Sequence, residues 1–270
     1  MRFRDHVALI TGASSGIGAA LAKEFARQGA DVVLVARRED RIRSLAEEIE
    51  KMGKRAVPLT CDVRSADEIS QAVTQARAKL GKIDIVVANA GFGVVGNVET
   101  LKTQDFRRQF ETNVFGVLNT FYAVSEDLRK TKGRFAIIGS VNGYVSLAGN
   151  APYAMSKFAV RALADSLHQE LAPSGLSVTH ICPGFVESEI RQVDNQGIRH
   201  ERAKDRVPQW LRFPADQAAK QIVHAIFKRK REKIITFHGK VAVFLQRHLP
   251  CLFASLRGHL RVTARKEAKA

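Results

Sequence analysis

The chain has 270 residues, 45% of them hydrophobic, which is enough for a full core in one large domain or two small ones. Cys61, Cys182 and Cys251 are few and widely spaced, which excludes a disulfide framework or a zinc-ligand motif, and we expect no metal site. No secretory signal and no run of about 18 apolar residues is visible, so we predict a cytoplasmic protein without a membrane-spanning helix.

The charge is strongly positive and unevenly distributed. The net charge is +16, and residues 220–270 alone carry 13 Lys or Arg against two Glu. This imbalance leaves two interpretations open. The basic residues form a solvated face, or they face an anionic partner such as a membrane surface, an acidic carrier protein or nucleic acid. The sequence contains no recognisable nucleic-acid-binding motif, so we expect no nucleic-acid partner.

Short apolar runs alternate with helical patterns along the chain. Strands are expected over residues 7–10, 32–35, 56–59, 83–87, 135–138, 178–181 and 233–237. Helices are expected over residues 18–28, 41–52, 66–79, 106–128, 153–171 and 215–228. Near-continuous apolar strands separated by helices predict a doubly wound α/β (Rossmann) fold, a parallel sheet of about seven strands with helices on both faces.

No linker interrupts this rhythm, so we predict a single domain over residues 1–237. Two regions depart from it. Residues 185–214 form a long polar connection, and residues 238–270 form a basic extension beyond the last strand.

A glycine-rich segment directly follows the first predicted strand and opens the first helix. Its glycines, Gly12, Gly16 and Gly18, have the spacing GxxxGxG. Small residues let a backbone approach a pyrophosphate, and the helix N-terminus favours negative charge. This placement predicts a dinucleotide-binding loop, although an ordinary glycine-rich turn has the same composition.

Further motifs follow in order. They are Asp62-Val63, Asn89-Ala90-Gly91, Asn113, Ser140, Tyr153-x-x-x-Lys157 and Pro183-Gly184. Together with the glycine loop, this set resembles the short-chain dehydrogenase/reductase family, over residues 7–237. The resemblance implies an oxidoreductase that transfers a hydride between a nicotinamide nucleotide and a carbonyl or alcohol, with residues 1–237 as its catalytic domain.

The expected reaction centre combines a phenol and an ammonium. Tyr153 and Lys157 are four residues apart on a predicted helix and therefore share a face. A phenol titrates near pH 10, and a nearby ammonium lowers that pKa toward the range of a general acid or base. The resemblance assigns the acid/base role to Tyr153 and the tuning of its pKa to Lys157. It also implies that Ser140 polarises the substrate oxygen and that Asn113 holds a relay water.

Two arginines after the second strand bear on the choice of cofactor. A carboxylate at this position would repel the 2′-phosphate of NADP(H), whereas the guanidinium groups of Arg37 and Arg38 can bind it. We therefore predict NADP(H), with Arg37 contacting the phosphate, Arg38 assisting and Ser14 donating a hydroxyl. Many NADP-using relatives have a basic residue where this chain has Ser15. The expected cofactor-binding residues are Gly12, Ser14, Ser15, Gly16, Ile17, Gly18, Arg37, Arg38, Asp62, Val63, Asn89, Ala90, Gly91, Tyr153, Lys157, Pro183, Gly184, Val186 and Ser188.

The segments expected around the substrate are largely apolar. Their apolar members are Phe92, Val94, Val95, Val141, Tyr144, Val145 and Leu147. They favour a hydrophobic ketone or secondary alcohol, lipid-like or steroid-like. The 185–214 connection is long enough to form a lid, with Trp210, Leu211 and Phe213 on its apolar underside. Two alternatives remain: a 3-oxoacyl chain on an acidic carrier protein, and a non-catalytic NADP(H)-binding module that docks through its basic extension.

The extension is both basic and apolar, and Pro250 divides it into two short helices or one kinked helix. Such a stretch is typical of peripheral membrane contact, here through residues 240–265. The alternative is that its apolar face closes the subunit's own core or a subunit interface. The family resemblance also implies a homodimer or homotetramer, with helices near 106–128 and 153–171 at the interface.

Overall fold

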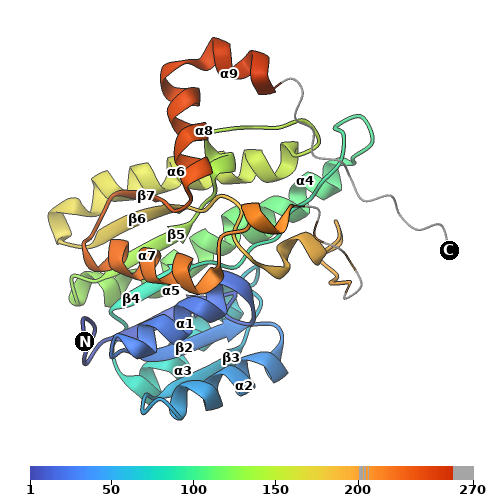
Figure 1. Ribbon diagram of the computed structural model, residues 1–270. Coiled ribbons are helices and arrows are strands. Elements are labelled where there is room, and N and C mark those ends of the chain that lie inside the picture. The colour runs from blue at the N-terminus through green and yellow to red at the C-terminus, as the bar shows by residue number, and fades with distance from the viewer. Residues whose placement is uncertain (201–202, 204, 206, 258–270) are drawn as a thin grey trace.

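The computed structural model describes residues 1–200, 203, 205 and 207–257, and it contains one seven-stranded sheet (Figure 1). Its spatial order is β3-β2-β1-β4-β5-β6-β7, and all six neighbouring pairs are parallel. The strands are β1 (Val7–Thr11), β2 (Asp31–Ala36), β3 (Ala56–Thr60), β4 (Ile85–Ala88), β5 (Arg134–Ile138), β6 (Ser177–Cys182) and β7 (Glu232–Ile234). The predicted doubly wound α/β fold is confirmed.

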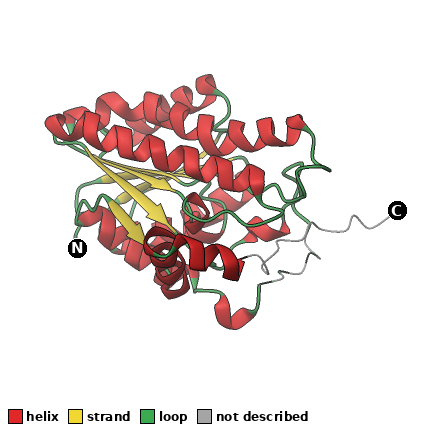
Figure 2. Cartoon of the chain, turned by 90° about the horizontal axis from the view of Figure 1, so that it is seen from above, coloured by secondary structure: helices red, strands yellow, loops and turns green. Residues whose placement is uncertain are grey.

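Helices cover both faces of the sheet (Figures 1 and 2). They are α1 (Gly16–Arg27), α2 (Glu39–Glu50), α3 (Ala66–Leu80), α4 (Thr103–Phe110), α5 (Gly116–Lys130), α6 (Ala151–Leu171), α7 (Ala215–Phe227), α8 (Phe237–His248) and α9 (Pro250–Arg257). Alternate strand residues point to opposite faces, so Ile10 packs with α1, α2 and α7, whereas Leu9 packs with α3, α5 and α6. This burial on both faces explains the continuous apolar strands.

Two elements differ from their predicted bounds by more than two residues. The last strand ends at Ile234 rather than at residue 237, because the Thr236 hydroxyl accepts the Gly239 N–H and caps α8. The helix expected over residues 106–128 is interrupted by a π-helical segment, η1 (Glu111–Phe115), between α4 and α5. Such bulges occur frequently at functional sites.

The C-terminal extension contains the two short helices expected around Pro250, which begins α9. Val243 of α8 and Phe253 of α9 are buried in a small core with Tyr144 and Val145. One apolar face of the extension therefore packs inside the subunit. Residues 258–270 of the predicted extension lie outside the described residues. Among those that are described, no helix has the length and hydrophobicity to cross a bilayer.

Candidate active site

The glycine loop lies where the strand order reverses, between β1 and β4, at the carboxyl ends of the strands. Gly12 has φ +65°, and a Cβ there would lie 2.8 Å from the Ala90 Cα. A Cβ on Gly18 would lie 2.2 Å from the Gly12 carbonyl oxygen. Asn89 holds the loop from β4, since its side-chain amide donates to the Thr11 carbonyl at 2.9 Å. The loop thus forms a narrow space at Gly12 and Gly18, here called the cradle, which the side chain of any larger residue would fill.

Three of the four residues expected to carry the chemistry meet beside this loop. Ser140 follows β5, and Tyr153 and Lys157 lie one turn apart on α6. All three line one cleft of about 600 Å³ with the glycine loop. The Lys157 ammonium lies 5.6 Å from the centroid of the Tyr153 ring and donates to the Ile138 carbonyl at 2.8 Å. The arrangement therefore provides a hydroxyl, a phenol and an ammonium at one point.

Burial dominates the electrostatics of this group. It raises the pKa of Tyr153, and a hydrogen bond with Ser140 and the charge of Arg191 partly offset that rise. Burial also lowers the pKa of Lys157 to about 8. The net shift of Tyr153 is thus opposite to the lowering that we expected from Lys157, because desolvation outweighs the neighbouring charges. The protonated phenol is therefore the resting form, which suits a proton donor.

Asn113 occupies the π-helical segment and is buried, and it does not line the cleft. Its amide oxygen accepts the Phe92 N–H at 3.1 Å, and its amide nitrogen donates to the Phe92 carbonyl and the Ser156 hydroxyl, each at 3.1 Å. These bonds tie the segment after β4 to α6. Asn113 therefore positions the wall behind Tyr153.

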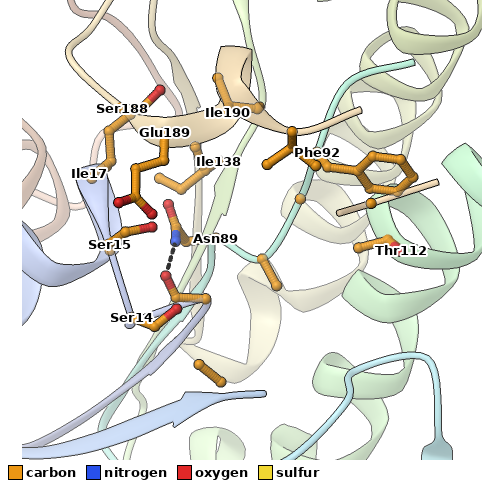
Figure 3. A pocket seen from close by; sticks show the side chains of 18 of the residues that line it. Ser14, Ser15, Ile17, Asn89, Phe92, Thr112, Ile138, Ser188, Glu189 and Ile190 are labelled. Carbon is orange, nitrogen blue, oxygen red and sulfur yellow. Dashed lines mark hydrogen bonds between the residues drawn. The ribbon is translucent and has the colours of Figure 1, made fainter. Parts of the chain in front are cut away.

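A cluster of arginines surrounds the outer side of the glycine loop. Arg38 donates to the Ser14 hydroxyl at 2.9 Å and to the Ser15 hydroxyl at 2.7 Å. Its guanidinium also pairs at 2.8 Å with Glu189, from the 185–214 connection. Figure 3 shows the Glu189 carboxylate pointing toward Ser15 of the glycine loop. Arg37, expected to be the leading contact, is instead largely exposed and lies 3.9 Å from Asp62. The structure thus places Arg38, rather than Arg37, on the loop serines.

Glu189 is the centre of this cluster. Its carboxylate oxygens also pair with Arg41 at 2.9 Å and with Arg199 at 3.1 Å. Burial acts to raise the pKa of Glu189, but Arg38 and Arg41 outweigh that effect and lower the pKa below its usual value. Three guanidiniums thus converge on one anion at the rim of the glycine loop.

The structure brings every expected cofactor-binding residue to the same cleft. The expected substrate wall is different. Of its seven apolar residues, Phe92 alone is among the described residues that line the cleft. Val94 is fully buried, and Tyr144 and Val145 pack beneath the extension. The expectation is wrong for Val141, Tyr144, Val145 and Leu147, because they pack with the extension, and for Val94, because it is fully buried. Val95 is partly buried and does not line the cleft either.

The connection over residues 185–214 contributes side chains that motif analysis missed. Those lining the cleft are Glu189, Ile190, Arg191, Val193, Gln196, Gly197 and Arg199. They come from irregular backbone with no recognisable spacing, so the length of the connection was the only available signal. The expected lid underside is also partly wrong, since Trp210 is 82% exposed, whereas Phe213 packs against the main core.

Comparison with known proteins agrees with this geometry. The family model described as short chain dehydrogenase matches residues 6–199. Oxidoreductase UcpA of Salmonella typhimurium is 40% identical over 187 residues, which cover 68% of this chain and 71% of the relative. An uncharacterized oxidoreductase of Myxococcus xanthus is 36% identical over 189 residues, covering 70% of this chain and 75% of the relative.

Solved structures show the same fold. An alcohol dehydrogenase from Thermococcus sibiricus, complexed with 5-hydroxy-NADP, has a TM-score of 0.74 at 27% identity, covering 85% of this chain and 95% of that one. A Burkholderia phymatum enzyme has a TM-score of 0.83 at 21% identity, covering 98% and 100%, and this likeness concerns the fold alone. With the family model matching well over half of its length, this chain belongs to the short-chain dehydrogenase family and is an oxidoreductase with that family's nucleotide-binding fold.

Proposed function

We propose that the protein is an NADP(H)-dependent oxidoreductase that interconverts a hydrophobic ketone and its secondary alcohol. The observation that carries this proposal is the shared cleft, in which Tyr153, Ser140 and Lys157 lie beside a glycine loop flanked by arginines. The bound nicotinamide would supply the hydride for reduction or accept it for oxidation. In reduction, Ser140 would hold the carbonyl oxygen and the Tyr153 hydroxyl would give it a proton.

The arginine cluster supports NADP(H) over NAD(H). Arg38 and Arg41 already bind a carboxylate at the rim of the loop. A 2′-phosphate offers more negative charge and more acceptor oxygens than a carboxylate, and guanidinium groups suit it well. Two solved relatives, the Thermococcus sibiricus alcohol dehydrogenase and a metagenomic short-chain oxidoreductase, were determined with 5-hydroxy-NADP and NADP respectively. We therefore give Arg38 the leading role toward the phosphate.

The lining near Tyr153 supports a hydrophobic substrate. Apolar side chains come from the segment after β4, from the end of β5 and from the 185–214 connection. They are Phe92, Ile138, Val186, Ile190 and Val193. Such a wall favours an extended or ring-shaped apolar carbonyl compound.

Outward-facing apolar residues on α5 and α6 support a homo-oligomer. Tyr122 of α5 is 68% exposed, and Met155 and Phe158 of α6 are 50% and 42% exposed. Neighbouring exposed apolar residues on two helices are typical of an interface between subunits. We propose that two copies pair through these helices.

The test is a turnover assay with purified protein. NADPH consumption is followed with steroid, aliphatic and aromatic ketones and with 3-oxoacyl esters, and NADH serves as the comparison. We expect NADPH-dependent reduction of hydrophobic ketones. Turnover of 3-oxoacyl esters alone would favour the carrier-protein alternative. Tight NADPH binding without turnover of any compound would favour the non-catalytic module.

A further inference from the structure

Helix α8 presents a second apolar face to the outside. Phe237, Val241 and Phe244 recur at the spacing of one helix face, and they are 81%, 42% and 57% exposed. The opposite face carries the buried residues Gly239 and Val243. A surface helix of a globular protein ordinarily has one apolar face and one polar face. The outer stripe of α8, defined here as Phe237, Val241 and Phe244, is therefore unexplained by the packing of the subunit.

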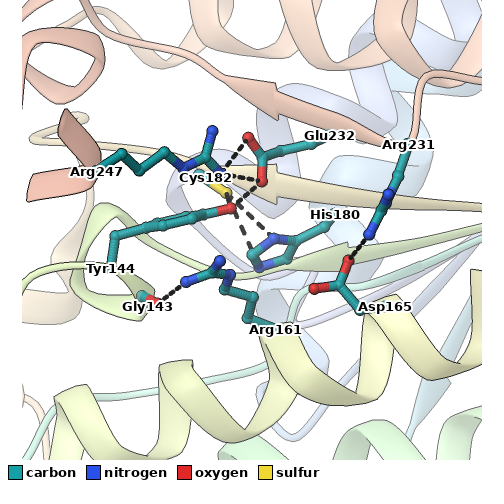
Figure 4. Close-up of polar contacts among 9 residues, drawn as sticks. All are labelled: Gly143, Tyr144, Arg161, Asp165, His180, Cys182, Arg231, Glu232 and Arg247. Carbon is teal, nitrogen blue, oxygen red and sulfur yellow. Dashed lines mark hydrogen bonds and ion pairs between the residues drawn. The ribbon is translucent and has the colours of Figure 1, made fainter. Parts of the chain in front are cut away.

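The contacts of α8 fix this stripe in its outward position. Arg247 donates to both carboxylate oxygens of Glu232 on β7 at 3.2 Å, and its guanidinium lies 4.8 Å from the centre of the Tyr144 ring. Tyr144 donates its hydroxyl to the same carboxylate (Figure 4). Rotating α8 to bury the stripe would break this network and remove Val243 from the core. The stripe is thus a stable surface of the folded subunit.

The surroundings of the stripe are basic. Between Glu232 and Glu267 the sequence contains seven Lys or Arg and no Asp or Glu, and the structure describes the side chains of three of these cations, Lys233, Lys240 and Arg247. Lys240 and Arg247 of α8 are exposed beside the stripe. Burial and the positive charges of Lys240 and Lys230 lower the pKa of Lys233. Two copies meeting through this surface would bring like charges together, whereas an anionic lipid surface complements both the charge and the apolar stripe.

The stripe also lies close to the active site. The Phe185 ring, directly after the cleft residue Gly184, stacks on His238 of α8 with ring centroids 5.4 Å apart. The Phe185 N–H donates to the same imidazole at 3.0 Å. His238 therefore joins α8, the helix that carries the stripe, to the loop that borders the cleft.

We propose that the outer stripe of α8 docks the protein peripherally on an anionic lipid surface, with Phe237 and Phe244 entering the headgroup region and Lys240 near lipid phosphates. This docking does not depend on the proposed reaction. Its corollary, that the cleft takes its hydrophobic substrate from that lipid surface, rests on the proposed function.

Flotation of the full chain with vesicles tests the docking. One set of vesicles is phosphatidylcholine alone, and the other contains equal parts of phosphatidylcholine and phosphatidylglycerol. We expect flotation with the anionic vesicles, and weaker flotation with neutral vesicles or at high salt. The double variant Phe237→Ser/Phe244→Ser should lower the partition coefficient at least about tenfold, because two aromatic side chains no longer leave water. Truncation at residue 238 is unsuitable, because it removes the buried Val243 and Phe253.

The matched control is Met52→Ser/Val98→Ser, which replaces two apolar residues that are 40% and 60% exposed elsewhere. It should float like the wild type. Three results would overturn the proposal: no wild-type flotation with anionic vesicles, equal flotation of the double variant, or self-association in sedimentation that the double variant abolishes while no flotation occurs. Neither cofactor nor turnover enters the assay, so a failure of docking is distinct from a failure of the proposed function.

Discussion

The two sides of the cleft are built in different ways. One side consists of regular elements, with the glycine loop between β1 and α1 and the Tyr153–Lys157 pair on α6. The other side is the 185–214 connection, whose described part contains only short 3₁₀ turns and isolated bridges. The two sides touch, since a Cβ on Gly16 would lie 3.0 Å from the Ser188 Cβ. The residues expected to carry the chemistry thus lie on regular helices and strand ends, whereas an irregular segment forms the facing wall.

The largest effect should come from the phenol on the rigid side. Tyr153→Phe removes the proton donor but leaves the ring and the cradle, so we expect turnover to fall by about 10³-fold with NADPH affinity unchanged. Steady-state rates and NADPH fluorescence titration measure the two quantities. Tyr122→Phe is the control and should behave as wild type, because Tyr122 lies outside the cleft and the variant keeps the apolar ring that we propose for the subunit contact. Near-normal turnover in the Tyr153 variant would contradict the assigned role.

The cradle itself should be the next most sensitive feature. Gly12→Ala places a methyl group against the Ala90 backbone, and we expect a loss of NADPH affinity of roughly 10- to 100-fold. Gly53→Ala is a matched control, because Gly53 also has a positive φ, +78°, but a Cβ there would meet nothing within 4 Å. The backbone strain is then similar in both variants. Equal NADPH affinities for the two would show that close approach at Gly12 does not shape the site.

The pH profile tests Lys157 on the same side. Its ammonium is the form that favours the transfer of charge to the Tyr153 oxygen, and its folded pKa is about 8. We therefore expect kcat/KM for ketone reduction to fall above about pH 8, by about tenfold for each further pH unit. The contribution of Lys157 to the stability of the folded state changes with pH in the opposite direction to kcat/KM. The lowered pKa means that the unfolded chain binds the proton more tightly, so this residue's contribution to stability rises between about pH 8 and its unfolded value of 10.5.

Glu189 tests the connecting side and should give the smallest effect. Its carboxylate occupies Arg38 and Arg41, the groups that we propose for the 2′-phosphate. Glu189→Gln should therefore tighten NADPH binding about fivefold and change NADH binding much less. Glu187→Gln, at an exposed position two residues earlier, is the control. Weaker NADPH binding in the Glu189 variant would mean that the carboxylate organises the arginines rather than competing for them.

The contrast between regular elements and the irregular connection also explains what could be predicted from the sequence. Strand and helix periodicity is local, so the seven strands and the glycine loop follow from short stretches of residues such as Val7–Thr11. The pairing of Arg38 with Glu189 joins positions 151 residues apart, and no local pattern encodes it. The substrate wall was mispredicted for the same reason. Whether Tyr144 faces a cleft or a core depends on where α8 packs. The residues around Tyr144 do not indicate where a helix distant in the sequence will pack.

The proposal that Arg38 selects NADP(H) over NAD(H) is tested most directly by titrating wild type, Arg37→Ala and Arg38→Ala in parallel with NADPH and NADH. We predict that wild type binds NADPH at least about tenfold more tightly than NADH. Arg38→Ala should remove this preference, and Arg37→Ala should keep most of it. Equal affinity of wild type for the two nucleotides, or an unchanged preference in Arg38→Ala, would contradict the proposal.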